Sequence, residues 1–368
     1  MDYTVTNNGI RNCFTGNGNG TANFCGLGPD GRAVSNLNGL LQRSIVRGVY
    51  DADYAIATLS LCRSMIDLGD RWHLTMGLRW DDFDYGNTLR NSAGVETRYA
   101  YSDSLWNGNA GVVYDLNDIA NVYVSYATAS DINGGESDVG GSCGYGGLCG
   151  TPEQVVLSKP ERVGNIELGT KWNLFDERLL VTAALFRITK DDVMESVGNA
   201  YSTIGTLNTG KNRVQGVEFG MVGNLTERLS GQFAASFMDS EVLEAFVANQ
   251  IGKKLSNFAD NSAHMQLRYQ WTPRFSFGGG ATYSGEMYAG QPDTAAGFDA
   301  ATGVYSYRVP SYTTFDAFAN YAFTDHFKAR LNIGNVFDKN YYLAAYRSGA
   351  FTYIGDARNA QLSFSVDF

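Results

Sequence analysis

Six short polar turns recur along this chain at intervals of roughly fifty residues. Each places turn-forming residues such as Asp, Asn, Thr or Pro between two apolar residues, as in Phe175-Asp-Glu-Arg-Leu179. The other five run from Leu68 to Trp72, Leu116 to Ile119, Leu225 to Leu229, Trp271 to Phe275 and Phe323 to Phe327. Because each turn joins two antiparallel strands, the six turns predict twelve strands, and the apolar alternation at the end of the chain predicts a thirteenth.

The connections between these hairpins are much longer than the turns. They cover about 84–103, 131–164, 189–212, 240–260, 286–310 and 338–357 and are rich in Gly, Asn, Asp, Ser and Tyr. Short turns at one end of a sheet and long loops at the other are typical of a transmembrane β-barrel. A soluble solenoid or propeller would also space its strands regularly, but with shorter strands and a more uniform period. We therefore expect an all-β protein, an antiparallel transmembrane β-barrel of 13–14 strands.

The predicted strands have one apolar and one polar row. In the last nine residues, Leu362, Phe364, Val366 and Phe368 alternate with polar residues. From Trp72 to Trp80 the apolar row begins and ends with Trp, and such a strand, tilted by about 40°, covers about 20 to 25 Å. That height matches the lipid-facing band of a barrel with its aromatic girdles.

Charged residues fall mostly on the polar row of these strands. An Arg or Lys that points into lipid costs roughly 2 to 4 kcal/mol near the bilayer midplane. We therefore expect eight charged side chains to face a polar lumen: Arg79, Glu167, Lys171, Arg187, Glu218, Arg268, Arg274 and Arg330.

Composition excludes several other classes of protein. Mean hydropathy is −0.22 and no run of eighteen apolar residues occurs, which excludes a membrane-spanning helix. The net charge of −10, without any Lys/Arg cluster, argues against a nucleic-acid partner. Residues 1–12 lack the basic start and apolar core of a signal peptide, so we expect this sequence to be a fragment, or to have lost its beginning if the protein is exported.

The first part of the chain differs in composition from the rest. Residues 7–39 contain 16 Asn or Gly, so we expect residues 1–45 to be a Gly/Asn-rich extracellular loop with room for part of a strand, and 46–368 to be the C-terminal part of the barrel. Two close cysteine pairs are candidates for loop disulfides: Cys13 with Cys25, and Cys143 with Cys149, with Cys62 left over. Binding of a metal by four thiolates is the alternative, but no C-x-x-C spacing supports it.

Catalytic motifs are weak in this sequence. Gly140-Gly-Ser-Cys-Gly144 matches G-x-S-x-G, but no buried strand precedes it and no helix follows it. The three histidines, His73, His264 and His326, are far apart and form no zinc motif. We therefore expect a protein that is not an enzyme and that has no resident metal or cofactor.

Three linked segments near the end of the chain resemble the C-terminal signature of TonB-dependent outer-membrane receptors. They are Tyr312-Thr-Thr-Phe-Asp-Ala-Phe-Ala-Asn-Tyr321, Leu331-Asn-Ile-Gly-Asn-Val-Phe-Asp-Lys-Asn-Tyr-Tyr342 and Gly355-Asp-Ala-Arg358. The blocks 160–179 and 209–219 resemble siderophore receptors, and 252–257 and 278–283 are similar to the ferric-catecholate type. The resemblance covers about residues 46–368.

The resemblance implies a 22-stranded barrel with an N-terminal plug that contacts TonB. This chain accounts for only 13–14 of those strands and shows no plug, so we expect the plug and the first strands elsewhere. The implied function is uptake of a ferric siderophore across the outer membrane of a Gram-negative bacterium, with iron present only as part of the chelate. The implied partners are the siderophore, the TonB complex through the plug, and outer-membrane lipid and lipopolysaccharide. Two alternatives stay open: uptake of another nutrient such as a carbohydrate or cobalamin, and a passive or structural barrel without energised uptake.

An anionic ferric chelate needs a basic and aromatic pocket at the outer ends of the strands. The candidate ligand residues are Arg308, Arg347, Tyr346, Tyr288, Tyr307 and Arg213. Each also has a structural interpretation: loop tyrosines often only pack loops together, and Arg213 could form a structural or plug-facing pair with Glu218. Arg358 is expected to fix the start of the last strand.

Overall fold

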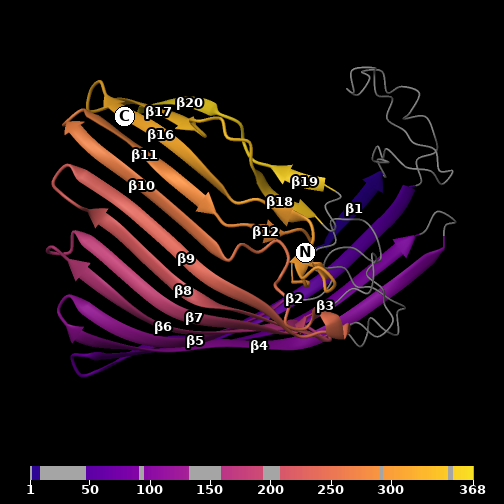
Figure 1. The fold of residues 1–368 in the computed structure, drawn as a ribbon. Coiled ribbons are helices and arrows are strands. Elements are labelled where there is room, and N and C mark those ends of the chain that lie inside the picture. The colour runs from indigo at the N-terminus through magenta and orange to yellow at the C-terminus, as the bar shows by residue number, and fades with distance from the viewer. Residues whose placement is uncertain are drawn as a thin grey trace, which may run out of the picture.

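The chain forms one large antiparallel sheet. The structure, a computed structural model, describes residues 2–8, 47–90, 95–131, 159–193, 208–290, 293–346 and 351–367. Fourteen strands follow one another in the sheet in sequence order and curve around a common hollow (Figure 1). They are β1 (Asp2–Asn8), β2 (Arg47–Leu68), β3 (Trp72–Arg90), β4 (Glu96–Asn117), β5 (Ala120–Asp131), β6 (Glu161–Leu174), β7 (Leu179–Val193), β8 (Gly210–Asn224), β9 (Leu229–Glu244), β10 (Asn261–Thr272), β11 (Phe275–Ser284), β16 (Tyr312–Ala322), β17 (Phe327–Gly334) and β20 (Asn359–Val366). This confirms the all-β fold and the expected 13–14 strands.

The remaining elements are short and lie in the long connections. They are the 3₁₀ helix η1 (Ala248–Gln250) and three two-stranded pairs: β12 (Met287–Tyr288) with β15 (Arg308–Val309), β13 (Phe298–Asp299) with β14 (Val304–Tyr305), and β18 (Tyr342–Tyr346) with β19 (Phe351–Ile354). Among the described residues, no helix has the length and apolar character needed to span a membrane.

All six predicted turns join neighbouring strands of the sheet. In three of them a Thr hydroxyl accepts a hydrogen bond from the backbone N–H three residues later: Thr226 from Leu229 at 3.0 Å, Thr272 from Phe275 at 3.0 Å and Thr324 from Phe327 at 2.9 Å. The hydroxyl thereby satisfies a donor that the turn leaves outside the strand ladder. This contact explains why Thr recurs at the start of these turns.

One predicted long connection is wrong. Residues 84–103 are mostly strand, because β3 continues to Arg90 and pairs there with Glu96 at the start of β4. Ser104 donates a side-chain hydrogen bond to Asp82 across this extension at 3.0 Å. A strand with water on both faces needs no apolar row. The Asp, Ser and Tyr residues of this strand extension therefore led to the prediction of a loop.

One face of the sheet is apolar and open to its surroundings. Val124, Leu168, Leu185, Val217 and Phe237 are direct neighbours across β5 to β9, and each is between 45% and 59% exposed. Rows of this kind continue to the last strand, where Leu362 and Phe364 are similarly exposed. A contiguous apolar face of this size on a folded chain marks a membrane or a partner surface.

The other face is polar and concave. A cavity of about 480 Å³ lies on it and is lined by residues from β8 through β17, among them Gln232, Arg268 and Arg330. In a flat sheet β8 and β17 would lie about 24 Å apart, at about 4.8 Å per strand, so one cavity can reach both only where the sheet curves toward it. We call this the concave face, and the apolar one the convex face.

Six of the eight charged residues expected in the lumen lie on the concave face. Tyr123 lies on that face and donates a hydrogen bond to Glu167, and its ring centroid is 5.3 Å from the ammonium of Lys171. Arg79, Glu218, Arg268 and Arg330 share the same face by strand register. Two of the expectations are wrong. Arg274 is exposed in the turn between β10 and β11, and Arg187 shares the convex face with Leu185, because the register pairs it with Ile166 and Gln215.

Candidate ligand site at the loop end of the sheet

Three long connections meet at the end of the sheet opposite the tight turns. They are residues 245–260, 285–311 and 335–358, and Asn257 joins all three. Its backbone N–H donates to the carbonyl of Tyr288 at 2.7 Å, and its side-chain amide donates to the carbonyl of Gly290. Its side-chain oxygen accepts from the backbone N–H of Ala345 at 3.1 Å. Asn257 has φ +51°, a conformation that Asn tolerates better than most residues do.

Close packing reinforces this junction. The N–H of Ser256 donates to the carbonyl of Thr294 at 2.9 Å, and the neighbouring Leu255 forms a bridge with Ala295. A Cβ on Gly290 would lie 2.3 Å from the Cβ of Ser256, so only glycine fits there. Met287, Ala289, Val309 and Ala345, from the second and third connections, form a small buried apolar cluster. The three connections therefore form one packed unit.

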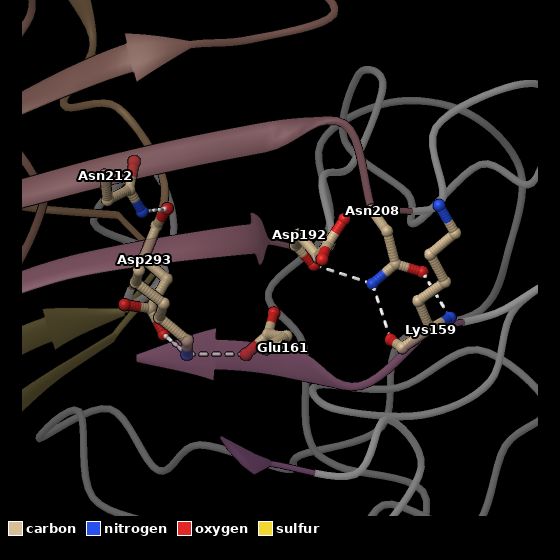
Figure 2. Close-up of polar contacts among 7 residues, drawn as sticks. Lys159, Glu161, Asp192, Asn208, Asn212 and Asp293 are labelled. Carbon is tan, nitrogen blue, oxygen red and sulfur yellow. Dashed lines mark hydrogen bonds and ion pairs between the residues drawn. The ribbon is translucent and has the colours of Figure 1, made fainter. Parts of the chain in front are cut away.

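The middle connection is also anchored to distant strands of the sheet. The ammonium of Lys190 on β7 lies 2.5 Å from a carboxylate oxygen of Glu161 on β6 and 2.9 Å from one of Asp293 (Figure 2). Asn212 on β8 donates to the carbonyl of Asp293 at 2.7 Å (Figure 2). Lys190, Glu161 and Asn212 all belong to the concave-face row, so the connection reaches across the mouth of the hollow.

A second polar contact in the same region holds the ends of β6 to β8. Asn208 accepts from the N–H of Lys159 at 2.8 Å and donates to the carbonyls of Lys159 and Asp192 at 2.7 and 2.6 Å (Figure 2). Asn208 has φ +57°, which an asparagine tolerates. The loop ends of these strands are thus fixed by side-chain amides.

Aromatic rings and ammonium groups gather within the loop unit. Tyr288 and Tyr305 stack with ring centroids 4.7 Å apart, and Phe298 packs edge-on against Tyr305 at 5.0 Å. The Lys253 ammonium lies 3.7 Å from the centroid of the Phe298 ring, and the N–H of Lys254 donates to the Tyr305 hydroxyl at 3.1 Å. We call Lys253, Tyr288, Phe298, Tyr305 and Arg308 the loop cluster. It combines flat π-faces with positive charge.

Two titratable groups in or beside the loop cluster have raised pKa values and therefore stay protonated at neutral pH. The hydrogen bond to Asp260 raises the pKa of Lys254, and nearby coulombic attraction to Asp260 adds to it. Burial, and then a hydrogen bond to Glu286, raises the pKa of Tyr288. At neutral pH Lys254 is therefore cationic and the Tyr288 hydroxyl is protonated and able to donate.

Three of the six predicted ligand residues lie together in the middle connection. Tyr288 and Arg308 are opposite each other in the β12–β15 pair, and the Arg308 guanidinium lies 2.5 Å from Glu286. Tyr307 precedes Arg308 with φ +54° and is 59% exposed. These three remain candidates for ligand contact.

Of the other three predicted ligand residues, the structure describes the side chain of Arg213 alone. Tyr346 belongs to β18 by its backbone, but its side chain lies outside the described residues, as does Arg347. Arg213 lies on the convex-face row and forms an ion pair with Glu241. Glu218 is on the opposite face from Arg213, so the suggested pair between these two is wrong.

Sequence reasoning missed the roles of Lys253, Asn257 and Phe298. The adjacent lysines in Gly252-Lys-Lys-Leu-Ser-Asn257 were a visible signal, but the ring that Lys253 covers is 45 positions away in the sequence. The candidate disulfide residues Cys13, Cys25, Cys143 and Cys149 lie outside the described residues, and so does the segment 140–144. Within the described part of the chain no group of three or more His, Cys, Asp or Glu is placed to hold a metal ion.

The last signature segments of the chain are structural. Asn335, with φ +46° and 4% exposed, donates to the carbonyls of Lys339 and Asp356 and accepts from the N–H of Lys339. Asp338 accepts from the N–H of Arg358 at 2.8 Å. These contacts close the base of the third connection, and they place the backbone of Arg358 just before β20, where the sequence led us to expect it.

Comparison with known proteins places this geometry in context. The family model described as TonB dependent receptor-like, beta-barrel matches residues 3–336. A probable TonB-dependent receptor, BfrD of Bordetella pertussis, is 33% identical over 82% of this chain and 39% of its own length. The catecholate siderophore receptor Fiu of Escherichia coli K12 is 30% identical over 73% of this chain and 33% of its own. The crystal structure of the siderophore receptor PiuA from Acinetobacter baumannii superimposes with a TM-score of 0.67 at 23% identity, covering 87% of this chain and 44% of that one. The chain therefore spans less than half the length of the relatives it matches.

Proposed function

Since this chain belongs to the family of TonB-dependent receptor-like β-barrels, we propose that it forms fourteen strands of the barrel of an outer-membrane receptor that takes up a ferric siderophore. The observation that carries the proposal is the loop cluster, which lies in loops that span the mouth of a polar, concave face. Anionic ferric chelates are recognised by cations and by flat aromatic surfaces, and the cluster offers both. The exposed apolar convex face supports a location in the outer membrane of a Gram-negative bacterium.

A catecholate chelate fits this cluster better than a purely aliphatic one. Its aromatic rings can stack on Tyr288 and Tyr305, and its negative charge can pair with Lys253, and with Arg308 where the chelate displaces Glu286. The relative Fiu, a catecholate siderophore receptor, supports the same class of ligand. Of the other sequence candidates, Tyr307 lies beside this cluster, and Tyr346 and Arg347 stay predictions.

Iron in this proposal is cargo and enters only as part of the chelate, so the protein itself holds no cofactor. Energised uptake would need the TonB complex and a plug, which the relatives' names and their greater length support. The receptor would act by binding and passage rather than by catalysis.

Binding and uptake of a ferric tricatecholate by the intact gene product test the proposal. We expect tryptophan fluorescence quenching to report binding, and a Lys253→Gln/Tyr305→Ala variant to bind at least about tenfold more weakly, since a cation and a stacking face are both lost. Lys328→Gln/Tyr321→Ala is the matched control, because both residues lie near the opposite end of the sheet.

The outcome also separates the alternatives. Tight binding of a ferric hydroxamate and none of the catecholate would overturn the substrate class. Binding of neither, with specific uptake of a carbohydrate or of cobalamin, would favour another nutrient, and an open single-channel conductance with no saturable uptake would favour a passive barrel.

A further inference from the structure

A groove lies on the convex face at the loop end of β4 to β7. It has a volume of about 470 Å³, and Trp106, Tyr126, Arg162 and Arg187 are among its lining residues. The strand register aligns Tyr126, Ile166 and Arg187 in one row of this face, next to the row that contains Leu168 and Leu185. The groove therefore opens toward whatever surrounds the barrel and not toward the hollow.

The charge in this groove is unbalanced. Arg187 donates a hydrogen bond to the side-chain oxygen of Gln215 at 3.0 Å, and within the described residues neither Arg187 nor Arg162 has a carboxylate within ion-pair distance. The one carboxylate that lines the groove, Asp191, is the register partner of Arg162 on β7, but its ion pair is with the ammonium of Lys211, 2.7 Å away. Among the described lining residues two guanidinium groups thus face a single carboxylate that is paired with a lysine, and the groove carries a net positive charge.

In the outer-membrane location proposed above, the groove lies at the height of the interface with the outer leaflet. Trp172 lies near the tight turn that follows β6, and Arg162 lies about 26 Å above it along the barrel axis, at about 3.4 Å per residue and a tilt of about 40°. Val181 is the register partner of Trp172 and so lies at the same level. With the same rise and tilt, Arg187 lies only about 16 Å above that level, which is inside the apolar band. A charge at that depth is unfavourable unless the side chain reaches up to the interface or meets an anion.

Aromatic side chains flank the two arginines at this level. Trp106 and Tyr126 are 57% and 52% exposed, and Trp106 packs against Trp80 with ring centroids 6.4 Å apart. Amphipathic rings of this kind occupy the headgroup region of a bilayer. Arginine binds phosphate oxygens through two parallel N–H donors, so the chemistry of the groove fits a phosphorylated headgroup.

We propose that this groove binds the phosphate of an anionic lipid of the outer leaflet, with Arg162 and Arg187 as the donors and Trp106 and Tyr126 against the first part of its acyl chains. The inference rests on the outer-membrane location proposed above and is independent of the transported ligand. It gives a position on this chain to the contact with outer-membrane lipid and lipopolysaccharide that the resemblance implies.

Native mass spectrometry of the intact gene product in detergent tests this site. The protein is titrated with bisphosphorylated lipid A, with the dephosphorylated glycolipid, and with zwitterionic phosphatidylethanolamine. Arg162→Gln/Arg187→Gln is compared with Arg228→Gln/Arg274→Gln, which removes the same charge from exposed turns at the other end of the sheet. Heat-modifiable migration in gel electrophoresis checks that each variant remains a folded barrel.

We expect the bisphosphorylated lipid to bind the wild-type protein and the turn variant equally, and the groove variant at least about tenfold more weakly. Dephosphorylated lipid and phosphatidylethanolamine should bind all three proteins alike. Equal binding of lipid A by a folded groove variant would refute the site. Displacement of lipid A by millimolar inorganic phosphate alone would overturn the lipid assignment, because it would reduce the groove to a simple anion site. Siderophore binding by the groove variant, measured in parallel, reports on the proposed function separately.

Discussion

Asn257 and Ala345 are 88 positions apart in the sequence, yet the Asn257 side chain accepts a hydrogen bond from the Ala345 backbone at 3.1 Å. Together with the bonds to Tyr288 and Gly290, this contact makes one side chain the junction of three outer connections. A buried hydrogen bond that loses one partner leaves the other unsatisfied, at a cost of about 1 to 3 kcal/mol. The junction therefore controls whether the loop cluster is preorganised for a ligand.

Replacement of Asn257 by Ala should loosen all three connections at once. Two side-chain hydrogen bonds disappear, and Ala is less favourable than Asn at φ +51°. We expect faster amide hydrogen exchange in residues 253–260, 287–290 and 342–345, with chelate affinity reduced about tenfold or more and the strand amides unchanged. Asn173→Ala, at an exposed position near a tight turn, is the matched control. Faster exchange confined to the first connection would show that Asn257 is not a shared junction.

Substitution of Gly290 tests the close packing at the same junction. In Gly290→Ala the new methyl group would lie 2.3 Å from the Ser256 Cβ and 2.4 Å from its hydroxyl, so one of the two segments must shift. We expect this variant to expose the middle connection to a protease. Ser256→Gly/Gly290→Ala removes both clashing atoms and should recover much of the protection, since the backbone bond from residue 256 to Thr294 remains. A double variant as sensitive as Gly290→Ala would point to a cause other than this clash.

Alkaline pH should loosen the loop cluster before it unfolds the barrel. The folded-state pKa values of Lys254 and Tyr288 are both raised, Lys254 by its hydrogen bond to Asp260 and Tyr288 by burial. Groups of this kind contribute stability that is fully present below the unfolded pKa values, about 10.5 for Lys and 10.0 for Tyr, and that is lost as the pH rises through the folded values.

We therefore expect chelate affinity to be flat from pH 7 to about 9.5 and to fall above about pH 10. Lys254→Gln should bind more weakly at neutral pH and show a smaller alkaline loss, because the ammonium is already absent. Affinity measured against pH for both proteins checks this. An alkaline loss of the same size in both would remove Lys254 from the explanation.

The sequence was informative where one physical constraint acts on every strand. Lipid on one side and a polar hollow on the other impose alternation, which is why six turns, the strand count and the face of Arg268 or Arg330 could be predicted. Arg187 was misplaced because the rule that charges face inward has an exception: the long side chain of an arginine within the apolar band can reach polar surroundings from the convex face.

The loop site was harder to predict, because nothing periodic acts on it. Tyr288 and Arg308 were found from residue type and approximate position, but the contact of Lys253 with Phe298 depends on how two connections fold over each other. Asn and Gly are common residue types in loops, so nothing in the sequence singles out Asn257 and Gly290. Their roles become visible only in the structure, through the positive φ of Asn257 and the lack of space for a Cβ at Gly290.

The ion pair of Lys190 with Asp293 and Glu161 makes a last prediction about the mouth of the hollow. Lys190→Met removes the ammonium that pairs with both carboxylates, so Asp293 should be repelled by Glu161 and its connection released from β7. Because Lys190 and Glu161 are largely buried, we expect local opening of residues 293–309 to become easier by about 1 to 3 kcal/mol, measured by hydrogen exchange. Lys190→Met/Asp293→Asn should recover part of the lost stability, because the repulsion between residue 293 and Glu161 is gone and the hydrogen bond from Asn212 to the backbone of residue 293 remains. Lys328→Met, which breaks an exposed pair with Asp367 at the other end of the sheet, serves as the control and should leave this segment unchanged. Unaltered exchange in Lys190→Met would show that backbone contacts alone hold the connection across the mouth.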